Sequence, residues 1–235
     1  MSRLNPHLDF IKDNNLFFLD LELEKFRNYN KFIEEHFNKT IDNHQEEYKA
    51  VMDKIENQPS LYSDLQLNHI QDSLVDRMIE IDRDFVQSFR ASMITQLYSF
   101  LERTLIGACE SYELNHNKEF GVDDLRGNGD FEKAKLFLTK SAKVDIKLLE
   151  PNWSFLNNLR VLRNCIVHNN STVFDNEKRK YNCLSSFSKN RFEIWERDRE
   201  ISFFTILLTQ EKFVDEIIEN IFSLFEKLEK FEVYI

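Results

Sequence analysis

Glycine and proline are scarce in this chain of 235 residues, which contains only four glycines and three prolines. Both residues mark turns and interrupt helices, so their scarcity argues against a fold of many short strands and tight turns. Leucine, glutamate, lysine and phenylalanine are abundant instead, and the 22 phenylalanines can fill a core with large rings. The composition therefore predicts an all-α fold with long helices and no more than a minor hairpin.

Cysteine is also scarce, and Cys109, Cys165 and Cys183 form no C-x-x-C pair. The first thirty residues lack a basic segment followed by an apolar one, and no run approaches the ~20 apolar residues that cross a bilayer. The histidines show no H-x3-H spacing, and the RGNGD sequence at residues 126–130 lacks the spacing of a phosphate loop. These absences predict a reduced, cytoplasmic protein with no membrane partner, no metal and no cofactor.

The net charge of -10 argues against a protein that coats nucleic acid through a general electrostatic field. Residues 151–200 differ, since they hold nine Lys or Arg against six Asp or Glu, an excess of 9 - 6 = +3. The rest of the chain therefore carries -13. A local basic patch or ordinary solvated surface charge explains this excess equally well.

Apolar residues recur at steps of three and four from about Leu16 to Asn57, which predicts one helix roughly 60 Å long. A second such pattern begins after Pro59 and runs to about Leu114, so the two helices should form an antiparallel hairpin. We place a soft boundary near Ile81, which gives a hairpin of residues 1–81 and a helical domain of residues 82–235. A single domain fits the length equally well.

Residues 115–130 predict a loop, and a helix should follow to about Lys143. Pro151 suits the first turn of the next helix, and Trp153 should anchor that helix in the core. The polar residues 171–190 predict a loop. Apolar residues then alternate as in a short hairpin, before a strongly amphipathic last helix: Phe192, Ile194, Ile201 and Phe203.

The stretch LNNLRVLRNCIVHNN, residues 156–170, contains the pattern R-N-x-x-x-H in Arg163, Asn164 and His168. On a helix, Asn164 and His168 share a face with Arg160, and Arg163 lies ~100° to one side. A histidine can serve as acid or base at neutral pH, and an arginine fork can hold two phosphate oxygens. Short motifs also arise by chance, and the alternative is that both side chains simply pair with surface acids.

This motif, on a helix late in an all-helical domain, resembles the HEPN superfamily. The surrounding order is similar too: LRGNGDFEKAKLFLTK at residues 125–140, then Trp153, the motif, a strand-like pair and an amphipathic helix. The resemblance covers about residues 82–235. It implies a HEPN-like helical bundle and a homodimeric, metal-independent endoribonuclease, as in toxins and antiviral effectors, that cleaves RNA by attack of its 2'-hydroxyl.

In that interpretation Arg163 and His168 are catalytic, and Asn164 and Arg160 support them. Lys178, Arg179 and Lys180 are candidates for RNA binding, and an antitoxin or regulatory protein would be a further partner. The alternative is a HEPN-like module that binds RNA or a protein without cutting, or a helical scaffold. Two lesser candidates have simpler explanations: Cys165 as a buried apolar filler, and Glu102 as one more solvated acid.

Overall fold

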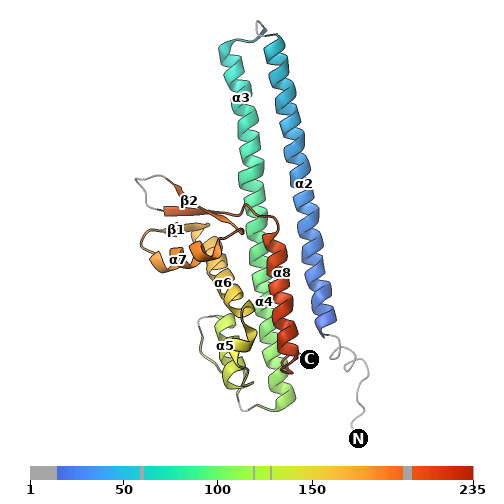
Figure 1. The fold of residues 1–235 in the computed structure, drawn as a ribbon, viewed down its shortest axis with the longest axis vertical. Coiled ribbons are helices and arrows are strands. Elements are labelled where there is room, and N and C mark those ends of the chain that lie inside the picture. The colour runs from blue at the N-terminus through green and yellow to red at the C-terminus, as the bar shows by residue number, and fades with distance from the viewer. Residues whose placement is uncertain (1–14, 59–60, 119, 128, 198–202, 235) are drawn as a thin grey trace.

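The computed structural model describes the whole chain except residues 1–14, 59–60, 119, 128, 198–202 and 235. The fold is mostly α-helical with one small sheet, which confirms the predicted class. Figure 1 shows two features that organise it: a long helical hairpin and a body packed beside the lower half of that hairpin. The candidate site lies in the body.

The first helix of the hairpin, α2, spans Asn15–Asn57, as its periodicity predicts. The returning chain comprises α3 (Asp64–Ile79), a π-helical turn η2 (Glu80–Phe85) and α4 (Val86–His116). Ser63 begins α3 through a capping box, because its Oγ accepts from the Gln66 amide at 3.4 Å and its own amide donates to Gln66 Oε1 at 3.0 Å. These three segments form one continuous rod (Figure 1).

Helix α2 belongs to both parts of the molecule. Leu19 and Leu23 are fully buried in the core of the body, where α2 packs on α4 and α8. Beyond Glu34, Ile55 is the one residue of α2 that is buried. The distal half of α2 and α3 thus form a two-helix arm with its apolar stripe half exposed. The soft boundary near Ile81 falls inside η2, and the division into two domains stays a prediction.

The body contains α5 (Asp130–Lys140), a 3-10 turn η3 (Ile146–Leu149), α6 (Asn152–Asn169) and α8 (Phe213–Glu229). Helices α4, α6 and α8 contact one another around a continuous core. Trp153 is buried and stacks on Phe131 with ring centroids 4.4 Å apart, so it anchors α6 as predicted. Rings supply much of the packing, as the phenylalanine content indicates.

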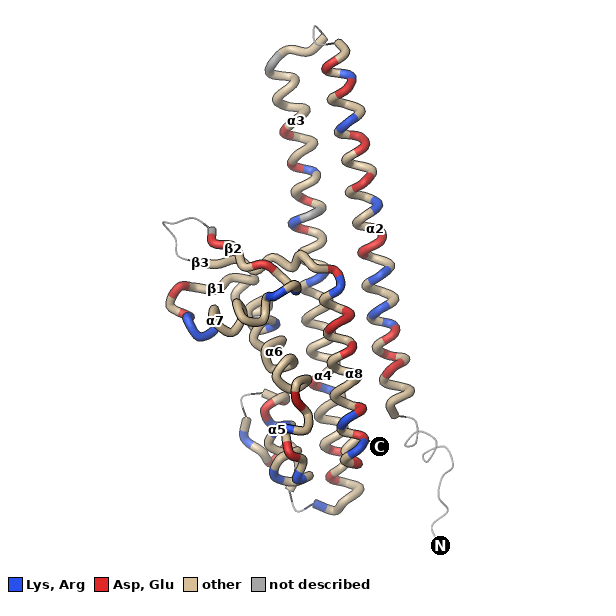
Figure 2. Tube along the Cα trace, viewed as in Figure 1, with Lys and Arg blue, Asp and Glu red and all other residues tan. Residues whose placement is uncertain are grey.

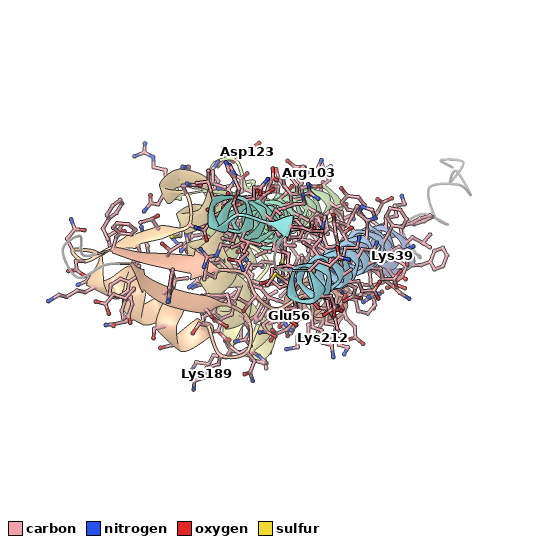
Figure 3. The ribbon with its side chains drawn as sticks, turned by 90° about the horizontal axis from the view of Figure 1, so that it is seen from above. Lys39, Glu56, Arg103, Asp123, Lys189 and Lys212 are labelled. Carbon is pink, nitrogen blue, oxygen red and sulfur yellow. The ribbon has the colours of Figure 1, made fainter. Side chains whose placement is uncertain are left out.

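A three-stranded antiparallel sheet covers one end of α6. Its strands are β1 (Thr172–Phe174), β2 (Glu193–Arg197) and β3 (Phe203–Leu207), in the order β1-β3-β2. The β2-β3 pair confirms the predicted hairpin, although Ile201 lies outside the described residues. Figure 3, a view down the long axis, shows the sheet on one side of the hairpin, with Lys189 projecting outward below it.

The prediction of a loop over residues 171–190 is wrong. The segment forms strand β1 and helix α7 (Lys178–Phe187), whose Leu184 and Phe187 are buried. Three basic residues begin α7, where the helix dipole disfavours positive charge. Burial of the apolar residues of α7 outweighs that penalty, which is why the local sequence did not reveal the helix.

Two further observations concern membrane spans and the cysteines. Among the described residues, no helix combines the length and hydrophobicity that a membrane span requires. The three cysteines are free thiols.

Candidate functional site

Helix α6 presents one face to the core and another to solvent. Leu156, Leu159, Leu162 and Cys165 are fully buried against the other body helices. Asn164, Val167 and His168 are exposed. The helix ends at Asn170 in the left-handed conformation, φ 48°, which asparagine tolerates better than most residues. The motif residues therefore lie on the outer side and edge of a well-anchored helix.

Arg163 lies at the edge of α6 that faces α4, and it is half-buried. Its Nη1 donates to Asn164 Oδ1 at 3.1 Å, and its guanidinium carbon lies 6.0 Å from the centroid of the Tyr98 ring. An arginine over an aromatic face gains about 0.5–1 kcal/mol at a partly exposed site. The hydrogen bond of Asn164 shows that this side chain orients Arg163.

Glu102 of α4 is half-buried beside the same group, so the interpretation of Glu102 as one more solvated acid is wrong. Burial raises the pKa of the Glu102 carboxyl and nearby Asp130 raises it further, while Arg163 and Arg160 oppose the shift. Burial and the Glu102 charge likewise raise the pKa of the Tyr98 hydroxyl. Among the described residues that hydroxyl has no partner of ordinary hydrogen-bond geometry, so Glu102 acts on it mainly through charge.

Sequence reasoning missed Tyr98 altogether and undervalued Glu102. The two residues are four apart on α4, so they share one face of the helix, next to the buried stripe of Leu97, Leu101 and Leu105. The sequence shows that spacing, but it does not show which side of α4 is covered by α6.

Arg160 lies one turn before Asn164 and contacts α5. Its Nη2 lies 3.2 Å from Glu132 Oε1 and donates to Asn157 Oδ1 at 3.0 Å. Arg160 also lines a hollow of about 460 Å³ together with Arg126 and Glu132. Arg160 therefore adds positive charge at the rim of the site, within an ion pair.

The Nε atoms of Arg160 and Arg163 are buried and have no hydrogen-bond partner among the described residues. A buried donor without a partner costs free energy, and native proteins contain few of them. Two such donors, on residues three apart in one helix, mark a locally unfavourable arrangement. Arrangements of this kind are expected at functional or strained sites.

His168 is exposed in the last turn of α6. It lies five positions after Arg163, which at ~100° per residue places the two side chains roughly 140° apart around the helix. Arg163 is directed to α4 and His168 to solvent. Within one chain, the two predicted catalytic groups thus lie on different sides of α6.

The basic residues predicted for RNA binding lie in the first turn of α7, the blue segment at that helix in Figure 2. Lys178 and Arg179 are exposed. Lys180 is half-buried and forms an ion pair with Glu177. Two of the three cations are therefore presented to solvent.

Cys165 is fully buried, and its thiol donates to the Thr172 carbonyl at 3.2 Å. Burial raises the pKa of the Cys165 thiol to about 11, so the group stays protonated at neutral pH. This environment suits a small core side chain and disfavours a nucleophile.

No group of three or more His, Cys, Asp or Glu side chains that could hold a metal ion occurs among the described residues. The chain was also compared with known proteins. No family model, no curated protein sequence and no solved structure matches it.

Proposed function

We propose that this protein is a metal-independent endoribonuclease of the HEPN type, which cleaves RNA at a site shared by two copies of the chain. The observation that carries the proposal is that α6 holds a cation fixed at the core and a histidine open to solvent. Arg163 is held by Tyr98 and Asn164 at the edge of the core, while His168 is open to solvent on the same helix. A rigid cation and an accessible acid or base are the two groups that such a reaction needs.

RNA supplies its own nucleophile, the 2'-hydroxyl. One His168 removes the proton of this hydroxyl, and the 2'-oxygen attacks the neighbouring phosphorus. Arg163 stabilises the additional negative charge of the phosphorane. A second histidine donates a proton to the departing 5'-oxygen as the phosphorus–oxygen bond breaks. The products are a 2',3'-cyclic phosphate and a 5'-hydroxyl end.

The requirement for two copies follows from the number of groups that the reaction needs. It needs both an acid and a base, and each chain supplies one His168, which lies roughly 140° from Arg163 around α6. A two-fold axis next to α6 would bring the His168 side chains of both copies to one phosphate, and the long Arg163 side chains would reach it from the edges of the two helices. An antitoxin or other regulator would act by covering this outer face of α6.

The second candidate is a HEPN-like module that binds RNA or a protein without cutting. The acids around the arginines favour it, because Glu132 pairs with Arg160, and Asp130 lies close enough to Glu102 to raise the pKa of that carboxyl. These carboxylates compensate positive charge that a phosphate would otherwise attract.

The experiment that separates the two is RNA cleavage in the presence of a chelator. Wild type is compared with His168→Ala and Arg163→Ala, and with His69→Ala, an exposed histidine on the arm, as the matched control. We expect cleavage with cyclic phosphate ends by wild type and His69→Ala, and loss of cleavage in the two site variants. Binding of RNA without cleavage by the wild type would support the second candidate. Equal cleavage by all four proteins would refute the assigned site.

A further inference from the structure

The β-sheet has one covered face and one open face. Residues directly opposite each other in an antiparallel pair project to the same side. Thr205 of β3 is opposite both Thr172 and Trp195, and Phe203 is opposite Phe174. These residues therefore share one face, which we call the aromatic sheet face: Thr172, Phe174, Trp195, Phe203 and Thr205.

The other face of the sheet is packed against the body. Val173 and Ile206 on that face are buried. Phe204 contacts Tyr181 of α7 with ring centroids 4.4 Å apart. The sheet is thus fixed on its covered side, and the aromatic sheet face is free to act as a rigid surface.

Large aromatic groups are exposed on this face. Trp195 is 51% exposed and Phe174 is 49% exposed. Phe203 is half-buried, and its strand β3 lies between the strands of the other two rings. Neighbouring strands are ~4.8 Å apart, so the three rings span the distance covered by two or three successive nucleotides. Aromatic rings on an open sheet are a surface on which unpaired bases stack.

Positive charge lies at two margins of the aromatic sheet face. The Arg83 guanidinium carbon, on η2, lies 5.8 Å from the centroid of the Trp195 ring. Lys178 and Arg179 are exposed at the start of α7, which follows Phe174 after a short turn. Exposed acids lie here too. Glu193 is on the aromatic sheet face itself, two residues before Trp195 on β2, and Asp84 and Asp175 are near in the chain. Cations that flank rings can meet phosphates while bases stack, and the nearby acids limit the electrostatic share of binding.

The aromatic sheet face borders the end of the motif helix. A hollow of about 270 Å³ lies between Trp195, Arg83 and the residues Asn170 and Ser171. Ser171 has φ 59° directly after Asn170 at 48°, so two consecutive left-handed residues turn the chain from α6 into the sheet. A strand of RNA on this face would therefore reach the end of α6 two residues after His168.

We infer that the aromatic sheet face binds single-stranded RNA by base stacking on Trp195 and Phe174, and that it holds the substrate beside the end of α6. This rests on the proposed function, because it names the surface that presents RNA to His168. Double-stranded RNA should bind poorly, since its bases are not available for stacking. Because few cations take part, the affinity for RNA should depend only weakly on salt. For three phosphate contacts, a plot of the logarithm of the association constant against the logarithm of the salt concentration should have a slope no steeper than about -2.

The test uses full-length protein carrying His168→Ala, so that binding is measured without cleavage. The probe is a fluorescein-labelled ten-nucleotide RNA without self-complementarity, with an abasic oligonucleotide of equal length and an RNA duplex as comparisons. We expect Trp195→Ala to weaken single-strand binding roughly 10- to 100-fold. Phe174→Ala should have a smaller effect in the same direction. Phe32→Ala, an exposed phenylalanine of α2, is the matched control and should leave binding unchanged.

Tryptophan fluorescence gives a second readout that a general loss of folding would not reproduce. The chain has only two tryptophans, and Trp153 is buried against Phe131. RNA should quench the emission of Trp195. Trp195→Phe should keep most of the affinity, because it keeps a ring, and should lose the quenching.

Three results would overturn the inference. One is equal binding by Trp195→Ala and the parent protein, and another is equal binding of the abasic oligonucleotide. The third is a change in oligomeric state in Trp195→Ala with no RNA binding by the parent, which would make the face a contact between copies. If the protein cleaves RNA but Trp195 plays no part, the aromatic sheet face is rejected and the proposed nuclease function stands. If RNA stacks on this face but is not cleaved, the nuclease function is rejected and the binding surface stands.

Discussion

Two half-buried arginines lie at two contacts of α4, and their surroundings differ. Arg90, where α4 meets α2, makes a two-pronged ion pair with Glu34 at 2.7 and 2.8 Å and also donates to the Leu208 carbonyl at 2.7 Å. Arg163, where α6 meets α4, donates to its neighbour Asn164 and lies over the Tyr98 ring. Arg90 therefore links α4 to α2 and to the segment at Leu208, whereas the hydrogen bond of Arg163 stays within its own helix.

The difference separates a structural arginine from one suited to a ligand. The Arg90 and Glu34 side chains are only 12% and 6% exposed, so each charge depends on the other in a dry environment. The Nε of Arg163 is buried and has no hydrogen-bond partner in the described part of the chain, and Glu102, the carboxylate that Arg163 influences, has a raised pKa. We therefore expect Arg90 to contribute mainly to stability and Arg163 mainly to activity.

The largest effect on stability should come from Arg90→Ala. Removing this side chain leaves the buried charge of Glu34 without its partner, which costs about 3–5 kcal/mol of unfolding free energy. Chemical denaturation monitored by circular dichroism measures this, with Lys25→Ala, from an exposed pair with Glu22, as the control. RNA cleavage by folded Arg90→Ala should match the wild type. A loss of stability below about 1 kcal/mol would contradict the structural role.

Arg163→Ala should show the opposite balance. We expect cleavage to fall about 10²- to 10³-fold, as when one charge-stabilising group is removed from an active site. Unfolding free energy should fall by only about 1 kcal/mol through loss of the contact with Tyr98. Single-turnover cleavage and chemical denaturation give the two numbers. Arg163→Lys should not restore full activity, because an ammonium lacks the planar fork, and full activity in that variant would argue against a two-oxygen contact with phosphate.

Glu102→Gln tests the electrostatics around Arg163 through pH. Burial raises the pKa of Glu102 above its ordinary value of 4.5, so the folded protein holds this proton to higher pH than the unfolded chain does. The charged carboxylate therefore costs stability as pH rises above that value. The melting temperatures of variant and wild type should be equal near pH 4, and the variant should become the more stable one toward pH 7. A less stable variant at pH 7 would show that attraction to Arg163 outweighs burial.

Thiol labelling should show the smallest effect, because no cysteine is assigned to the chemistry. Burial raises the pKa of Cys109 to about 12 and that of Cys165 to about 11, and both side chains are inaccessible. Iodoacetamide should therefore modify the half-buried Cys183 first in the native protein, as mass spectrometry of peptides can show. Fast labelling of Cys165 accompanied by loss of cleavage would revive a thiol nucleophile.

The long helices could be predicted because their sequence pattern is long and regular. The apolar stripe of α2 persists over 43 residues, and Pro59 follows its end, so period and breaker agree. The β2-β3 hairpin was also predictable from alternation. Strand β1 has three residues and α7 has ten, and both lie in a polar segment. Their stability comes from packing on α6 and β3, which the local sequence does not encode.

The residues of the candidate site were predictable only in part. Arg163, Asn164 and His168 were identified by spacing, and the structure places them on the outer side and edge of α6 as a helix requires. The role of Tyr98 and Glu102 depends on which face of α4 meets α6. The aromatic sheet face depends on the register of three strands, one of which the sequence did not reveal. Relations between distant segments, rather than residue types, were the missing information.

The most direct test of the shared site is a mixed dimer that contains one intact and one inactive chain. A wild-type chain and a chain with both Arg163→Ala and His168→Ala would be co-expressed with different affinity tags, and the mixed dimer would be purified through both tags and assayed on RNA in chelator. Because a site built across two copies needs the histidines of both chains, it predicts cleavage far below half of that of the wild-type dimer. Cleavage at about half of the wild-type rate would show that each chain carries a complete site and would contradict the shared site.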